Sequence, residues 1–123
     1  MATAKTSKSV DTFSQETAPS LKCSPKTRKT THFCEDESIT LRLRIWGNPA
    51  PKITWKFNGK NISQNRRVSI RKQGSFLTLH INRSKISDAG IYSVNLCNVC
   101  GNNTKSFHVH VIPKNPAYGK QNV

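Results

Sequence analysis

Residues 39–46 read Ile-Thr-Leu-Arg-Leu-Arg-Ile-Trp, and aliphatic side chains occupy every second position of this stretch. Successive side chains of a β-strand point to opposite faces of its sheet, so a period of two predicts a strand with one buried face. The inward positions would be Ile39, Leu41, Leu43 and Ile45, and the outward ones Thr40, Arg42, Arg44 and Trp46. The stretch therefore predicts a strand that presents two arginines and a tryptophan outside the core.

Further runs with the same alternation follow at short intervals, at residues 53–57, 68–70, 77–81, 92–96 and 107–111. Asn58-Gly59, directly after the first of these runs, is a strong hairpin-turn signal. No apolar stripe with the 3.6-residue period of a helix extends over three turns. Short alternating runs at this spacing predict an all-β domain in which two antiparallel sheets pack as a sandwich.

The composition divides the chain into three parts. Residues 1–31 are rich in Thr, Ser and Lys and almost lack periodic apolar residues, which predicts a basic disordered tail that could order against a partner. Residues 113–123 contain two prolines and predict a short C-terminal tail. Residues 32–112 remain as the folded domain, and a chain of 123 residues allows one domain with a modest core.

The chain is strongly basic, with 20 Lys and Arg against 6 Asp and Glu and a formal net charge of +14. Most of the excess lies in residues 32–123, so it belongs to the folded part. Charge of this size bears on partners and association rate, and it favours an acidic surface such as an actin or tubulin filament, nucleic acid or an anionic membrane.

The sequence predicts neither a membrane-spanning segment nor a secretory signal. No stretch approaches the roughly 20 apolar residues of a membrane span. The first residues, from Met1 to Lys8, lack the apolar core of a secretory signal. If Met1 is the natural start, the sequence predicts a cytoplasmic or nuclear protein.

Two motifs carry a family resemblance. The stretch Gly47-Asn48-Pro49-Ala50-Pro51-Lys52-Ile53-Thr54-Trp55 and the stretch Asp88-Ala89-Gly90-Ile91-Tyr92-Ser93-Val94 resemble the I-set immunoglobulin family, especially the intracellular titin-like, myosin-binding and palladin-type modules. The resemblance covers about Glu35 to Val111. It implies an immunoglobulin-like antiparallel β-sandwich with Trp55 in its core and a tyrosine corner at Tyr92. It also implies an ion pair between Asp88 and Arg67, with Arg66 as the other candidate partner.

The chain departs from the family pattern at the bridge between the sheets. Leu43 and Val94 stand where this family usually has its cysteine pair. The resemblance therefore implies a sandwich that lacks the inter-sheet disulfide and is suited to a reducing compartment. Ser84 occupies a position that is usually apolar, so the turn around it is expected to be looser.

The sequence gives little support for a metal site or a catalytic site. Cys97-x-x-Cys100 invites a zinc or redox hypothesis, but zinc needs about four ligands in a tetrahedral array. Cys34 is expected at the opposite end of the sandwich and Cys23 in the tail. The histidines, His32, His80, His108 and His110, are scattered over strands or tail. The sequence predicts no metal, no cofactor, no small-molecule substrate and no enzyme, with a thiol or metal protein kept as a rival hypothesis.

One face is the candidate binding site. Alternation sends five side chains outward, namely Arg42, Arg44, Trp46, Arg71 and His80. The family resemblance implies that the strands carrying them, around residues 39–46, 68–71 and 77–81, belong to one sheet. An exposed tryptophan between arginines is a typical interface anchor. A second cluster, Lys52, Lys56, Lys60 and Arg66, is interpreted as general basicity.

The predicted function is a non-catalytic, cytoplasmic binding module with a structural or scaffolding role on an acidic filament or its larger assembly. The filament would be an actin or myosin-associated structure, as in the sarcomere, or a microtubule, as in the axoneme of a flagellum. An extracellular adhesion or receptor domain with its signal missing is the alternative. Nucleic-acid binding through the basic surface is a lesser one, because no aromatic side chains interleave as a stacking platform.

Overall fold

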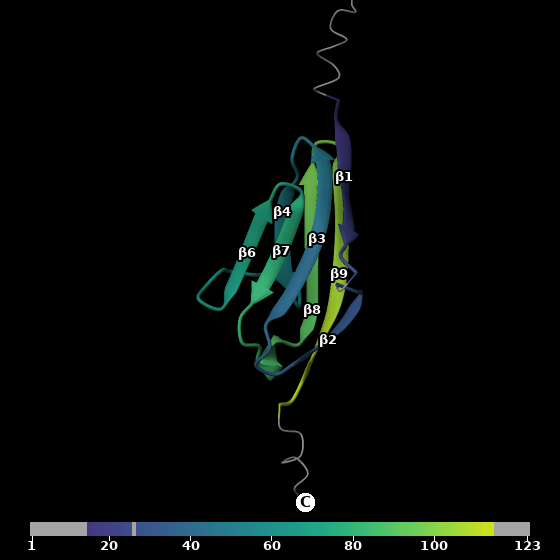
Figure 1. Ribbon diagram of the computed structural model, residues 1–123. Coiled ribbons are helices and arrows are strands. Elements are labelled where there is room, and N and C mark those ends of the chain that lie inside the picture. Colours follow the sequence, from purple (N-terminus) through teal and green to yellow (C-terminus); the bar gives the residue numbers. More distant parts are fainter. Residues whose placement is uncertain (1–14, 26, 115–123) are drawn as a thin grey trace, which may run out of the picture.

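The computed structural model describes residues 15–25 and 27–114. Strands form two sheets that lie face to face as layers (Figure 1), joined by short turns and one 3-10 turn at Ile86–Asp88. The first sheet has the order β1-β3-β7-β6, with β1 Thr17–Cys23, β3 Ile39–Asn48, β7 Phe76–Ile81 and β6 Val68–Gln73. The second has the order β2-β9-β8-β4-β5, with β2 Thr30–Cys34, β9 Gly101–Ile112, β8 Gly90–Asn98, β4 Lys52–Phe57 and β5 Lys60–Asn61. The predicted two-sheet sandwich is confirmed, and its strand pairs are antiparallel except β2 with β9, which is parallel.

The core consists of the inward side chains that the alternation predicts. In β3 the inward residues are buried and the outward ones exposed from Ile39 to Trp46. Leu43 and Val94 come from opposite sheets and are 1% and 0% exposed, in the same buried cluster as Trp55. Hydrocarbon therefore fills the bridge position, and all four cysteines are free.

Hydrogen bonds among Asp88, Arg67 and Tyr92 fix the start of β8. The Tyr92 hydroxyl donates to the Asp88 carbonyl oxygen at 2.6 Å, which is the predicted tyrosine corner. The Arg67 Nη1 and Nη2 atoms donate to Asp88 Oδ2 and Oδ1, each at 3.0 Å, so Arg67 is the ion-pair partner. Burial acts to raise the pKa of Asp88, but the guanidinium of Arg67 and the backbone N–H of Lys85 outweigh it and hold that pKa below its usual value.

The N-terminal boundary differs from the prediction, because β1 lies within the stretch assigned to a disordered tail. Residues 17–23 pair with β3, with Leu21 opposite Ile45 and Lys22 opposite Arg44. Pro19 is buried and Leu21 half-buried, and an edge strand tolerates a proline because one side of it needs no ladder bonds. The folded part therefore begins by Thr17. Residues 1–14 and 115–123, also assigned to tails, lie outside the described residues.

The turn around Ser84 is held more firmly than expected. Ser84 is fully buried, and its hydroxyl donates to the Cys34 carbonyl oxygen at 3.2 Å. Its backbone N–H donates to Glu37 and its carbonyl accepts from Asp36. The polar side chain thus ties two turns together, which corrects the expectation of a loose turn. In the described part of the chain, no helix is long and apolar enough to cross a membrane.

Candidate binding face

The outer surface of the β1-β3-β7-β6 sheet gathers the predicted site residues. We call it the basic face and define it by Lys22, Arg42, Arg44, Trp46, Arg71, Phe76 and His80. Strand register sets their arrangement, since Lys22 lies opposite Arg44 and Arg44 opposite Phe76. In a neighbouring row of paired residues, Thr78 of β7 lies between Arg42 of β3 and Arg71 of β6. The five residues singled out from the sequence therefore share one sheet and face outward.

Two aromatic rings organise the arginines of this face. The guanidinium carbon of Arg42 lies 4.7 Å from the Phe76 ring centroid, and that of Arg44 lies 5.3 Å from the same centroid. Arg44 also lies 5.4 Å from the Trp46 ring. Trp46 and Phe76 are 43% and 40% exposed. Stacking of this kind leaves the edge of a guanidinium available, because the cation–π contact uses its flat face.

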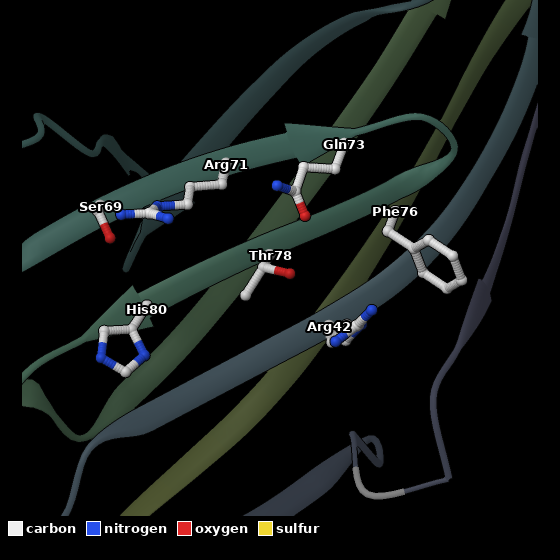
Figure 2. Close-up of a pocket in the computed structure, with 7 residues that line it drawn as sticks. All are labelled: Arg42, Ser69, Arg71, Gln73, Phe76, Thr78 and His80. Carbon is white, nitrogen blue, oxygen red and sulfur yellow. The ribbon is translucent and has the colours of Figure 1, made fainter.

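A hollow of about 330 Å³ lies on the basic face (Figure 2), lined by Arg42, Ser69, Arg71, Gln73, Phe76, Thr78 and His80. Thr78 stands on β7 between the strands that carry Arg71 and Arg42, and Phe76 and His80 flank it along β7. Thr40 Oγ1 lies 3.1 Å from His80 Nδ1, which holds the imidazole in place. The hollow is therefore lined by cationic, hydroxyl, imidazole and amide groups, with the Phe76 ring at one end.

Among the described residues, the charged side chains of the basic face are all cationic. Within residues 15–25 and 27–114, no carboxylate projects from the outer surface of this sheet. The described acids lie at other places, namely Glu16, Glu35, Asp36, Glu37 and Asp88. The side chains of Arg42 and Arg71 make no hydrogen bond or ion pair to another described residue. Their positive charge is thus available to an external anion.

Sequence reasoning missed two members of the basic face. Phe76 precedes the run that was expected to start at residue 77, although Phe76, Thr78 and His80 continue the same alternation. Lys22 lay in the expected tail, so it was not placed beside Arg44.

The members of the second basic cluster lie in two places. Three of them, Lys52, Lys56 and Lys60, are exposed on β4 and β5 of the opposite sheet, and Arg66 is exposed before β6.

The cysteines and histidines form no recognised metal centre. Cys97 and Cys100 are exposed at the β8–β9 turn, and Cys34 lies at the end of β2. Local desolvation and the Glu16 carboxylate raise the pKa of Cys100, which disfavours the reactive thiolate. The histidines are less scattered than expected, because His32 and His110 stack with ring centroids 4.7 Å apart and His108 lies 5.3 Å from His110. Among the residues with described positions, no group of three or more His, Cys, Asp or Glu is arranged to hold a metal ion.

Comparison with protein families gives one match that covers most of the chain. The model of the immunoglobulin I-set domain matches residues 22–111. This range begins inside β1, within the stretch that the sequence assigned to a tail, and ends in β9.

Several curated proteins are similar in sequence over the same region. Hemicentin-1 of Mus musculus is 39% identical over 77 residues, which are 63% of this chain and 1% of hemicentin-1. The titin homolog of Caenorhabditis elegans is 32% identical over 89 residues, or 72% of this chain. The muscle M-line assembly protein unc-89 of the same organism is 34% identical over 55 residues, or 45% of this chain. The matched region spans about one hundredth or less of the length of these three relatives.

Solved structures of titin domains share the fold. The titin M3 domain is 26% identical with a TM-score of 0.68, and the alignment covers 76% of this chain and 96% of that domain. A chimeric titin Z1Z2 protein aligns with a TM-score of 0.72 at 23% identity, over 80% of this chain and 99% of the other.

Proposed function

The chain belongs to the immunoglobulin I-set family, and from this premise we propose that it is a non-catalytic binding module whose basic face docks on an acidic cytoskeletal filament. Its role would be structural, within actin and myosin assemblies of the sarcomere type. The I-set family is generally non-catalytic, and binding sites on such sandwiches are built from exposed faces and loops.

One observation carries the proposal. The outer face of the β1-β3-β7-β6 sheet combines four cationic side chains with two exposed aromatic rings, and no described carboxylate neutralises it. Arginine and tryptophan are the residue types that most often dominate the energy of protein interfaces. An acidic protein surface is the complement of such a face, and charge complementarity speeds the encounter.

The similarity to muscle proteins supports the choice of filament. Two of the relatives above are a titin homolog and a muscle M-line assembly protein by name. A microtubule offers a similarly acidic lattice, so it forms the second arm of the experiment.

Co-sedimentation with F-actin and, separately, with microtubules tests the proposal. The test variant carries Arg42→Glu, Arg44→Glu and Arg71→Glu. The matched control carries Lys52→Glu, Lys56→Glu and Lys60→Glu, which changes the net charge equally on the opposite sheet. Each exposed ion pair contributes about 0.2–1 kcal/mol, and reversal replaces attraction with repulsion of similar size. The test variant should therefore bind roughly 10- to 10,000-fold more weakly.

We expect the wild-type domain to pellet with filaments at low ionic strength and to be released by salt, because the Debye length falls from about 30 Å at 0.01 M to about 8 Å at 0.15 M. The control variant should pellet nearly as well as the wild type. Equal loss of pelleting in both variants would mean that net charge alone drives binding, and unchanged pelleting of the test variant would refute the proposed face.

A further inference from the structure

We propose that the hollow of the basic face binds a phosphorylated side chain, phosphoserine or phosphothreonine, of the protein partner. The inference rests on the proposed function, because it specifies the chemistry of the partner at that same face.

The first argument is the placement of the two arginines. Arg42 and Arg71 lie on either side of Thr78 in the same register row. Neighbouring strands are about 4.8 Å apart, so the two arginine backbones are separated by roughly 10 Å. Long side chains that start at this separation can both reach one group placed above Thr78. Both arginines line the hollow, together with Thr78 (Figure 2).

The second argument is that the hollow contains hydrogen-bond donors without a partner among the described residues. The guanidinium groups of Arg42 and Arg71 have no hydrogen-bond partner among the described residues. The hydroxyls of Ser69 and Thr78 and the amide of Gln73 line the same hollow. When the Thr40 hydroxyl donates to His80 Nδ1, the ring proton resides on Nε2, which leaves that N–H free to donate as well.

The third argument distinguishes phosphate from carboxylate. A phosphate monoester carries a charge of about −1.5 to −2 at pH 7 and has three terminal oxygens. It can accept fork-shaped hydrogen bonds from two guanidinium groups on opposite sides and a hydroxyl bond from below. A carboxylate has one charge and two oxygens in one plane, so a single arginine neutralises its charge and the second cation of the hollow has no charge to match. Clusters of arginine are the usual means by which proteins recognise phosphorylated residues.

The surroundings of the hollow suit a peptide. Phe76 borders the cationic groups, and the exposed Trp46 follows Arg44 along β3. An interface with an aromatic anchor beside polar and arginine contacts has the composition of protein–protein recognition. The hollow of about 330 Å³ is large enough for a phosphorylated side chain and part of its backbone.

The test is an NMR titration of the ¹⁵N-labelled chain with N-acetyl-O-phosphothreonine amide, with N-acetyl-glutamate amide and inorganic phosphate as comparison probes at constant ionic strength. We expect saturable shifts of the Thr78, His80 and Arg71 amide signals, with the phosphothreonine probe binding at least tenfold more tightly than the glutamate probe. Arg71→Gln should weaken phosphothreonine binding at least tenfold, and Lys56→Gln on the opposite sheet should leave it unchanged. Equal affinity for the two amino-acid probes, or shifts spread over both sheets, would overturn the inference.

Thr78→Val tests the contribution of the central hydroxyl. The substitution keeps every cation and the side-chain shape but removes the hydroxyl that would bond the phosphate from below, so it should weaken phosphothreonine binding. Pelleting of the wild-type domain with unphosphorylated filaments separates this inference from the proposed function. If pelleting depends on the basic face and the phosphothreonine probe still causes no shifts, the proposed function stands and the inference is wrong. Flotation with phosphoinositide-containing vesicles that depends on Arg71, without binding of the phosphothreonine probe, would also overturn it in favour of a lipid headgroup.

Discussion

Replacing Asp88 with asparagine should destabilise the folded domain by about 1–3 kcal/mol at neutral pH. The carboxylate accepts three hydrogen bonds, two from Arg67 and one from the backbone N–H of Lys85. The introduced asparagine would keep one carbonyl oxygen, but its amide N–H₂ would face a guanidinium donor. The charge attraction and at least one charge-assisted hydrogen bond would be lost.

The magnitude follows from burial. Side chains of the ion pair are 32% exposed for Arg67 and 14% for Asp88. Fully exposed ion pairs contribute about 0.2–1 kcal/mol, and removal of one partner from a buried pair costs about 3–5 kcal/mol. A half-buried pair lies between these limits. The chain offers an exposed counterpart, because Asp36 and Lys114 pair at 3.0 Å with exposures of 46% and 68%.

Urea denaturation followed by circular dichroism, repeated between pH 7 and pH 3, measures the effect. Asp88 has a lowered pKa in the folded state, whereas an unfolded aspartate titrates near a pKa of about 3.9. The stabilisation from this group is therefore fully present above about pH 5 and is lost as the pH falls through the folded-state pKa. The difference between wild type and Asp88→Asn should therefore decrease as the pH falls below about 4. Asp36→Asn should change stability by less than about 1 kcal/mol throughout.

A difference that stays constant from pH 7 to pH 3 would refute the reasoning. It would show that the carboxylate charge contributes nothing and that the Asp88→Asn substitution acts by altering the turn. An equally large effect of Asp36→Asn would refute the argument from burial.

Two further substitutions probe the core and the first residue of β8. Leu43→Ala removes three carbon atoms from a side chain that is 1% exposed, and it should cost about 2–5 kcal/mol in the free energy of unfolding measured by urea titration. A loss below about 1 kcal/mol would mean that the bridge position collapses around the smaller side chain. Gly90→Ala would place a Cβ atom 2.7 Å from both Asn58 Oδ1 and Phe57 Cε1, so the side chains of Asn58 and Phe57 must shift. We expect a loss of about 1–3 kcal/mol in the same assay, and a stability equal to the wild type would contradict the close packing.

The sequence predicted the strands whose inward positions are large and aliphatic. β3 is the clearest case, because burial of alternate residues follows directly from its side chains. The same signal is weak in β1, where Leu21 is the one large aliphatic residue and the backbone bonds to β3 hold the strand. The first half of β9 is likewise polar on both faces, so its length could not be read from hydropathy. Backbone pairing does not require apolar side chains, so a polar stretch can pair without a hydropathy signal.

Strand alternation alone predicted only the part of the candidate site that lies on β3. Arg42, Arg44 and Trp46 project outward because the residues between them are buried. The placement of Arg71 and His80 beside them required the order of strands in the sheet, which came from the family resemblance. The stacking of His32 on His110 depends on the parallel register of β2 and β9, two strands far apart in the sequence, and no local pattern specifies it.

The stacking of arginines on Phe76 and Trp46 has a consequence for conformational entropy. A free arginine side chain has about 2 kcal/mol of rotamer entropy to lose, and immobilising such a side chain at an interface costs about 0.5–1.5 kcal/mol. Arg42 and Arg44 are held against aromatic rings in the free domain. Part of their ordering is therefore complete before a partner arrives, so this face should bind more tightly than an equal number of unrestrained cations would.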